Sequence, residues 1–214
     1  SACATRSKAG PSGRAAASRL FPASSNGRLR APVFFVRTRE PTPIIPIPFP
    51  IAIHRVAYSR QEPSSRYVEL IALYRRMHRE GDVTHDIAPE KTFEGRSLPR
   101  QAHRIRPLVR LTAARTILDY GCGKGTQYRR APIKQYGVVR WNSIQEYWGV
   151  ESIHCYDPAY EPFSELPAGR FDGVICTDVL EHCPEQDLDW IIDGLFSFAD
   201  KFVYANVACY PARK

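Results

Sequence analysis

The sequence predicts an α/β domain built on an open, mostly parallel β-sheet. Short apolar runs typical of buried strands recur in the second half of the chain, and segments with helical apolar spacing precede and separate them. A glycine-rich loop follows the first of these runs, as at the ligand-binding end of such sheets. The chain of 214 residues is 43% hydrophobic and 24% charged, which fits one or two globular domains and excludes a coiled rod or a collagen-like repeat.

Three amphipathic segments predict helices. The first begins after a serine pair at 64–65, which can cap it, and ends at Gly81. The second opens at Ser97 and Pro99 and continues to about Val109, with a bend expected where a proline interrupts it. The third lies between residues 184 and 199. Each segment places its apolar side chains on one face, so each is expected to pack against a sheet.

Four short apolar runs predict buried strands at 116–119, 153–156, 171–177 and 202–207. The glycine loop follows the first strand, and the third predicted helix separates the last two. This alternation of strands and helices is typical of an open α/β sheet.

The net charge of +8 comes from the N-terminal head, residues 1–60. This head holds ten Lys and Arg residues against a single acid, Glu40, whereas residues 61–214 are close to neutral. Residues 1–39 are rich in Ala, Ser, Gly and Arg and show no sustained periodicity, which predicts disorder. The run at 41–50 is apolar but contains five prolines, which excludes a membrane-spanning helix.

Three interpretations of the head stay open. It can be a disordered tail or an over-extended gene start, an organelle targeting peptide, or a nucleic-acid-binding or partner-binding arm. The nucleic-acid interpretation is the weakest, because the basic residues are not interleaved with aromatic stacking platforms. The domain organisation expected from the sequence is therefore a basic, proline-rich head (1–60) followed by one folded domain (61–214).

Six scattered cysteines form no C-x-x-C pair and no disulfide framework of a short secreted domain. They are better explained as small buried apolar side chains than as zinc ligands, since neighbouring His and Cys residues on a strand point to opposite faces. No metal site is expected, and a reducing, cytoplasmic setting is favoured.

The loop Asp119-Tyr120-Gly121-Cys122-Gly123-Lys124-Gly125 is the most informative segment. It lacks the G-x-x-x-x-G-K-[ST] pattern of a phosphate-binding loop and the third glycine of the dinucleotide fingerprint. What remains is an acidic residue at a strand end, followed by glycines at alternate positions that let the backbone approach a ligand closely. A carboxylate in this place suits a ligand that carries amino groups or positive charge better than a pyrophosphate.

Here the sequence resembles the class I S-adenosylmethionine-dependent methyltransferases, most closely small bacterial and phage methyltransferase-domain proteins. ILDYGCGKG is similar to their first motif, Tyr156-Asp157-Pro158 stands where they place an acidic residue at the next strand end, and FDGVICTDVLEHC is similar to their fourth-strand motif. The likeness covers about residues 92–210 and implies a Rossmann-like sheet with S-adenosyl-L-methionine as cofactor.

The resemblance implies a role for each matching position. The first acid and the glycines of the loop are expected at the methionine end of the cofactor, and Cys122 contributes backbone there. Asp157 is expected to bind the ribose hydroxyls, although an aspartate before proline can also simply form a turn. Thr177 and Asp178 are expected beside the methionine amino group or the methyl-transfer channel. The implied cofactor-binding residues are Asp119, Gly121, Cys122, Gly123, Asp157, Thr177 and Asp178.

The reaction implied is an in-line displacement that transfers methyl to an unidentified acceptor, in which proximity supplies most of the acceleration. A base is needed only for an acceptor that is protonated at neutral pH. His182 is the first candidate for that base, followed by Glu181 and Asp178. The two acids have a second interpretation, because they precede a predicted helix whose positive end they can favour.

The segment 92–97 offers two further cofactor-binding candidates, Phe93 and Ser97. It can fold over the cofactor as a lid, or it can be a loop followed by a helix cap. Aromatic residues in the insertion 126–150 can likewise stack on an acceptor or cover the sheet.

The sequence departs from the family pattern in two places. Thirteen residues separate Asp157 from Phe171, so the third strand of the family is expected to be short or absent, and the chain ends at Lys214, before the last two strands. The alternative function is therefore a cofactor-binding or scaffold module without turnover. No membrane partner is expected, and the oligomeric state is left open.

Overall fold

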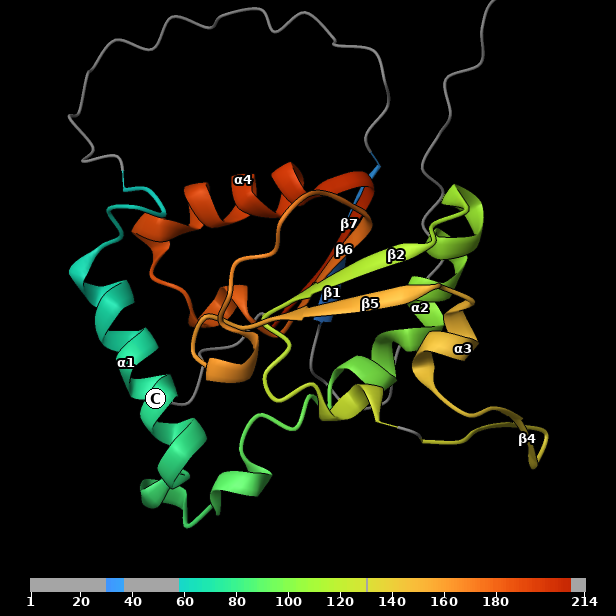
Figure 1. The fold of residues 1–214 in the computed structure, drawn as a ribbon, viewed down its shortest axis with the longest axis horizontal. Coiled ribbons are helices and arrows are strands. Elements are labelled where there is room, and N and C mark those ends of the chain that lie inside the picture. Colours follow the sequence, from blue (N-terminus) through green and yellow to red (C-terminus); the bar gives the residue numbers. More distant parts are fainter. Residues whose placement is uncertain (1–29, 37–57, 130, 209–214) are drawn as a thin grey trace, which may run out of the picture.

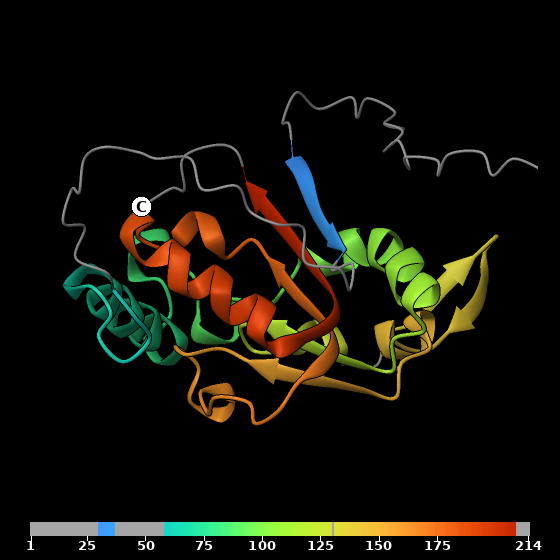
Figure 2. The same ribbon diagram turned by 90° about the horizontal axis from the view of Figure 1, so that it is seen from above.

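The computed structural model describes residues 30–36, 58–129 and 131–208 and shows one α/β sheet with helices on both faces (Figures 1 and 2). The five strands run in the order β1-β7-β6-β2-β5. Their bounds are β1 (Arg30–Val36), β2 (Thr116–Tyr120), β5 (Ser152–Tyr156), β6 (Phe171–Thr177) and β7 (Ala199–Ala208). The pairs β2–β5, β2–β6 and β6–β7 are parallel. The predicted α/β fold with a mostly parallel sheet is thus confirmed.

The alternating side chains of the central strands build two cores. Ile117, Ile175 and Tyr204 face α2 (Leu98–Thr112) and α3 (Ile144–Trp148) on one side of the sheet. Their direct sequence neighbours face α4 (Leu188–Phe198) on the other side; these are Leu118, Val174 and Val203. This is the period of two that strand geometry imposes, so both faces of the sheet are apolar and covered.

The helix α1 (Ser65–Glu80) lies across the end of the sheet at which β2, β5 and β6 finish (Figure 1). Its bounds agree with the prediction: the Ser64 side chain accepts a hydrogen bond from the backbone N–H of Tyr67, and Gly81 closes the helix at φ +88°. The outer face of α1 is exposed, and its inner face is half-buried above the strand ends.

The strand β1 lies within the N-terminal head and pairs antiparallel with β7. The prediction of disorder is therefore wrong for residues 30–36. The sequence PVFF supplies β-branched and aromatic residues, which strands favour, and β7 has an edge on which β1 can form backbone hydrogen bonds. The rest of the head up to residue 57 lies outside the described residues, and so does the proline run at 41–50.

Between β5 and β6 the chain forms a single 3₁₀ turn, Glu161–Phe163, and no strand. The insertion after the glycine loop instead forms a hairpin, β3 (Ile133–Gln135) and β4 (Val138–Trp141), followed by α3. The hairpin projects from the side of the domain that carries α2 and α3 (Figure 1). Among the described residues, no helix is both long and apolar enough to cross a lipid bilayer.

Candidate functional site

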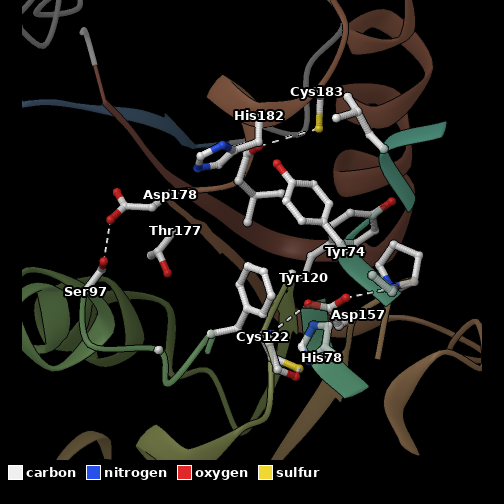
Figure 3. A pocket seen from close by; sticks show the side chains of 18 of the residues that line it. Tyr74, His78, Ser97, Tyr120, Cys122, Asp157, Thr177, Asp178, His182 and Cys183 are labelled. Carbon is white, nitrogen blue, oxygen red and sulfur yellow. Dashed lines mark hydrogen bonds between the residues drawn. The ribbon is translucent and has the colours of Figure 1, made fainter. Parts of the chain in front are cut away.

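A cavity of about 590 Å³ opens at the carboxyl ends of β2, β5 and β6, with α1 as its roof (Figure 3). Its walls come from the glycine loop, the residues that follow β5 and β6, and the segment 91–97. Ligands of open α/β sheets bind outside the carboxyl ends of the strands, and this volume lies within the range of about 300–1,000 Å³ found for small-molecule sites.

The glycine loop after β2 is held close to its neighbours. The backbone N–H groups of Gly121 and Cys122 both donate to the Tyr156 carbonyl oxygen, at 2.7 and 3.2 Å, so the loop is attached to the end of β5. Gly121 has φ +83°, and a Cβ atom at this position would lie 2.4 Å from Cγ2 of Val179. Only glycine fits that backbone and that approach.

Gly123 meets the segment 91–97 in the same way. A Cβ atom at Gly123, whose φ is +58°, would lie 2.6 Å from the Phe93 carbonyl oxygen. That carbonyl also accepts a hydrogen bond of 3.2 Å from the Lys124 N–H. The loop therefore touches both the β5 end and the segment that the sequence predicts as a lid or a cap.

Asp157 connects the ends of β2 and β5. Its Oδ2 accepts a hydrogen bond of 2.9 Å from the Gly123 N–H, and its Oδ1 accepts one of 2.9 Å from the Ala159 N–H. Burial raises the pKa of this carboxyl above its ordinary value, although the backbone N–H groups of Ala159 and Gly123 oppose the rise. The carboxylate lines the cavity, and each oxygen keeps a lone pair for a ligand. The structure is thus compatible with both roles predicted for Asp157, binding the ribose hydroxyls and forming a turn, because its hydrogen bond with the Ala159 N–H closes a turn.

Asp119 lies beneath the glycine loop and does not line the cavity. It is buried, and its Oδ2 accepts hydrogen bonds from Gln127 Nε2 at 3.1 Å and from the Tyr128 hydroxyl at 2.7 Å. Gln127 Nε2 also donates to the Cys122 carbonyl oxygen at 3.0 Å. Because side chains alternate along a strand, Asp119 supports the loop from below while its neighbour Tyr120 faces the cavity.

Asp178 follows β6 and is held in a left-handed backbone conformation, φ +55°. Its Oδ1 accepts a hydrogen bond of 2.5 Å from Asn206 Nδ2, and its Oδ2 accepts one from the Ser97 hydroxyl, as Figure 3 shows. The Ser97 side chain makes no cap hydrogen bond to α2. Ser97 thus precedes the helix as predicted, but its hydroxyl orients Asp178 at the cavity wall, where Thr177 also lies.

The three candidates for the catalytic base occupy different environments. His182 lines the exposed edge of the cavity, with its ring 6.3 Å from that of Tyr74. Glu181 does not line the cavity, and its Oε1 accepts a hydrogen bond of 3.0 Å from the Ala208 N–H. The segment Leu180–His182 is a single 3₁₀ turn, and α4 begins only at Leu188, so Asp178 and Glu181 are not in the first turn of that helix.

The roof helix contributes cavity residues that sequence reasoning missed. The side chains of Tyr67, Leu70, Ile71, Tyr74 and His78 project from α1 into the cavity. The signal was present for all but His78, because the other four positions belong, with Met77, to the apolar stripe from which the helix is predicted. Together with His78, which lies next to Met77, the stripe brings two tyrosines and a histidine to the cavity.

His78 is the polar group at the far end of that stripe. Its ring lies between those of Phe93 and Tyr160, with centroids 4.5 and 4.8 Å away. Burial, helped by the nearby charge of Lys124, lowers its pKa to about 4, so the imidazole is neutral at neutral pH. The segment around Phe93 therefore packs on the roof as well as on the glycine loop.

The aromatic residues of the insertion do not line the cavity: Tyr128, Tyr147 and Trp148 pack with the core, and Tyr136 is exposed. Trp148 is buried and donates from Nε1 to the Ala102 carbonyl oxygen of α2 at 3.0 Å. Trp141 and Tyr147 place their rings 4.6 and 4.3 Å from the Arg106 guanidinium carbon. Within the described part of the chain, no group of three or more His, Cys, Asp or Glu side chains could hold a metal ion.

The fold and the site thus define an α/β domain with a cavity at its strand ends. The chain is 30% identical over 109 residues to the magnesium protoporphyrin IX methyltransferase, chloroplastic, of Arabidopsis thaliana. This match covers 46% of the chain and 34% of the relative, so the chain spans about a third of the relative's length. No family model and no solved structure matches it. The similarity supports a methyltransferase-like domain.

Proposed function

We propose that this chain binds S-adenosyl-L-methionine in the cavity beneath α1 and transfers its methyl group to an acceptor, as a class I methyltransferase. One observation carries the proposal: the glycine loop after β2 and the acid after β5 meet in a direct hydrogen bond, Gly123 N–H to Asp157 Oδ2, at the wall of one cavity. The two motifs are 34 positions apart in the sequence, and the fold brings them into contact at the cavity wall.

The residues present fit this cofactor. The half-buried Asp157 carboxylate can accept hydrogen bonds from the two adjacent hydroxyl groups of the cofactor's ribose. The glycines of the loop leave no side chain between the backbone and a ligand. Lys124 does not line the cavity: its Nζ donates to the His78 carbonyl at 3.2 Å and to the Thr92 hydroxyl at 3.1 Å. The loop itself therefore offers no cation to a phosphate, and the basic residues of the cavity wall, Lys91 and Arg96, belong to the segment 91–97.

Bound S-adenosylmethionine supplies a methyl group activated on a positively charged sulfur. The chain's own residues orient and shield it. Asp178, fixed by Ser97 and Asn206, presents a carboxylate to the cavity wall, where it can attract an amino group or a positive charge. The α1 roof covers the cavity, and His182 at the cavity edge is placed to accept a proton from an acceptor that carries one. Glu181 takes no part in this scheme.

Isothermal titration of the full chain with S-adenosylmethionine and S-adenosylhomocysteine tests the cofactor assignment. We expect both to bind at one site, and we expect ATP and NADH, titrated as controls, to give no saturable heat. Incubation with methyl-labelled S-adenosylmethionine and a cell extract then tests turnover. Binding without any labelled product would favour a cofactor-binding module instead of an enzyme. Saturable binding of ATP or NADH in preference to S-adenosylhomocysteine would contradict the proposal.

A further inference from the structure

We infer that the methyl acceptor is a small, apolar aromatic molecule with one polar group, which occupies the part of the cavity between the middle of α1 and the end of β6. We call this part the acceptor compartment; it is lined by Tyr67, Leu70, Ile71, Tyr120, Val179 and Ile191. The inference rests on the proposed function, because it names the substrate class of the same site.

The roof of the compartment is fastened at its N-terminal end. Asp187 is fully buried, and its Oδ1 accepts hydrogen bonds from the Ser64 N–H at 3.0 Å and from Trp190 Nε1 at 2.9 Å. Its Oδ2 accepts a further hydrogen bond from the Ser64 hydroxyl. The ring of Tyr67, in the first turn of α1, packs edge-on against Trp190 with centroids 5.1 Å apart.

The other end of the roof is fastened by Lys124 and Thr92. Lys124 Nζ donates to carbonyl oxygens of His78 and Pro89 and to the Thr92 hydroxyl. The Thr92 hydroxyl donates to the Pro89 carbonyl oxygen at 2.7 Å, and the Met77 carbonyl oxygen of α1 lies at 3.3 Å from the same hydroxyl. Both ends of α1 are thus tied to neighbouring segments by part-buried or buried polar contacts, which favours a ligand that enters without displacing the helix. A small molecule can enter without such a movement.

The lining of the compartment selects an apolar ligand. Leu70, Ile71, Val179 and Ile191 present only hydrocarbon, and no carboxylate or ammonium group belongs to the set. A sugar or a nucleotide placed here would lose hydrogen bonds to water that these side chains do not replace. Aromatic rings fit beside the phenol faces of the tyrosines, which favour offset or edge-on ring contacts.

One polar atom of the compartment has no hydrogen-bond partner among the described residues. The Tyr120 hydroxyl is buried and unpaired, although its ring lines the cavity and its residue directly precedes Gly121. A buried hydroxyl without a partner calls for an explanation, and a ligand oxygen is the simplest one for a cavity-lining side chain. The acceptor is therefore expected to carry a hydroxyl or carboxyl oxygen next to the cofactor-binding loop.

Fluorescence titration with 2-naphthol, an aromatic alcohol, tests the compartment in the full chain. Ile71→Trp fills the compartment and should weaken 2-naphthol binding at least tenfold while S-adenosylhomocysteine still binds. Leu73→Trp places the same bulk on the outer face of α1, where Leu73 is 38% exposed, and should change neither affinity. Equal 2-naphthol affinity in the Ile71→Trp variant and the wild type, or no binding to either, would overturn the inference.

Tyr120→Phe tests the polar contact without depending on Ile71→Trp. The variant keeps the ring and removes a hydroxyl that is unpaired in the folded chain, so it should fold as well as the wild type. It should reduce the preference for 2-naphthol over naphthalene by about fivefold, the value of one neutral hydrogen bond. An unchanged preference would contradict the role of Tyr120.

The failure of this inference is distinguishable from failure of the proposed function. If S-adenosylhomocysteine does not bind the wild type, the proposed function is wrong. If it binds and the methyl label from a cell extract appears in acid-precipitated protein or nucleic acid, the substrate class is wrong. Label in the solvent-extractable fraction that is lost in Ile71→Trp and kept in Leu73→Trp supports the small apolar acceptor.

Discussion

The contact between Ser64 and Asp187 leads to the sharpest stability prediction. Asp187→Ala removes the acceptor of three hydrogen bonds, from the Ser64 N–H, the Ser64 hydroxyl and Trp190 Nε1. Hydrogen bonds to a charged acceptor are worth about 1.5–3 kcal/mol each, and donors left buried without an acceptor add a penalty. Because water will reach part of the vacated space, we expect a loss of about 3–5 kcal/mol in the free energy of unfolding.

Urea unfolding followed by far-UV circular dichroism measures this loss. Asp189→Ala is the matched control, because it removes an exposed carboxylate two positions away on α4 and should cost less than about 1 kcal/mol. If the alanine variant does not fold, Asp187→Asn keeps one acceptor oxygen and should lose about 1–2 kcal/mol. A loss below 1 kcal/mol in Asp187→Ala would show that Asp187 does not fasten the roof helix.

Two further predictions concern the glycine loop and its support. Burial raises the pKa of Asp119 from 3.8 to about 6. Between pH 3.8 and about pH 6 the Asp119 carboxyl therefore keeps its proton in the folded state and loses it in the unfolded state, so the free energy of unfolding falls as the pH rises through this range. The Asn side chain of Asp119→Asn does not titrate, so the free energy of unfolding of this variant, relative to that of the wild type, should rise by up to about 3 kcal/mol between pH 4 and pH 8. Urea unfolding measures this difference, and a difference that does not vary with pH would refute the prediction. Gly121→Ala should weaken S-adenosylhomocysteine binding at least tenfold, because its Cβ would lie 2.4 Å from Val179 Cγ2. Gly149→Ala is the control, because Gly149 has φ +75° and nothing lies within 4 Å of the new Cβ. It should lower the free energy of unfolding by about 1–2 kcal/mol and leave the affinity for S-adenosylhomocysteine unchanged. Equal effects of the two variants on this affinity would contradict the close approach at Gly121.

Elements with strong local signals could be predicted from the sequence. The strand at 171–177 has the predicted bounds, and the first helix begins and ends at its predicted caps. The hairpin β3–β4 was missed, although Tyr136 and Gly137, with φ +52° and +79°, form a tight turn whose Y-G pair is visible in the sequence. The strand β1 was missed because its pairing depends on β7, more than 160 positions further along.

The candidate site was predictable in outline and not in detail. Strand ends and glycines locate the cavity, because the carboxyl ends of parallel strands meet at one edge of the sheet. Whether Asp119 or Tyr120 faces that cavity depends on the phase of the strand, which an apolar run buried on both faces does not reveal. The contacts of Ser64 with Asp187 and of Ser97 with Asp178 span 123 and 81 positions, and no local pattern indicates them.

The central claim, that the cavity holds S-adenosylmethionine against Asp157, is tested most directly by titration of S-adenosylhomocysteine into three forms of the chain. The wild type should bind with saturable heat, and Asp157→Ala should bind at least tenfold more weakly, since hydrogen bonds to a charged acceptor contribute about 1.5–3 kcal/mol each. Glu161→Ala, which removes an exposed acid four positions away, should match the wild type. No saturable heat with the wild type, or equal affinities of the wild type and Asp157→Ala, would contradict the account.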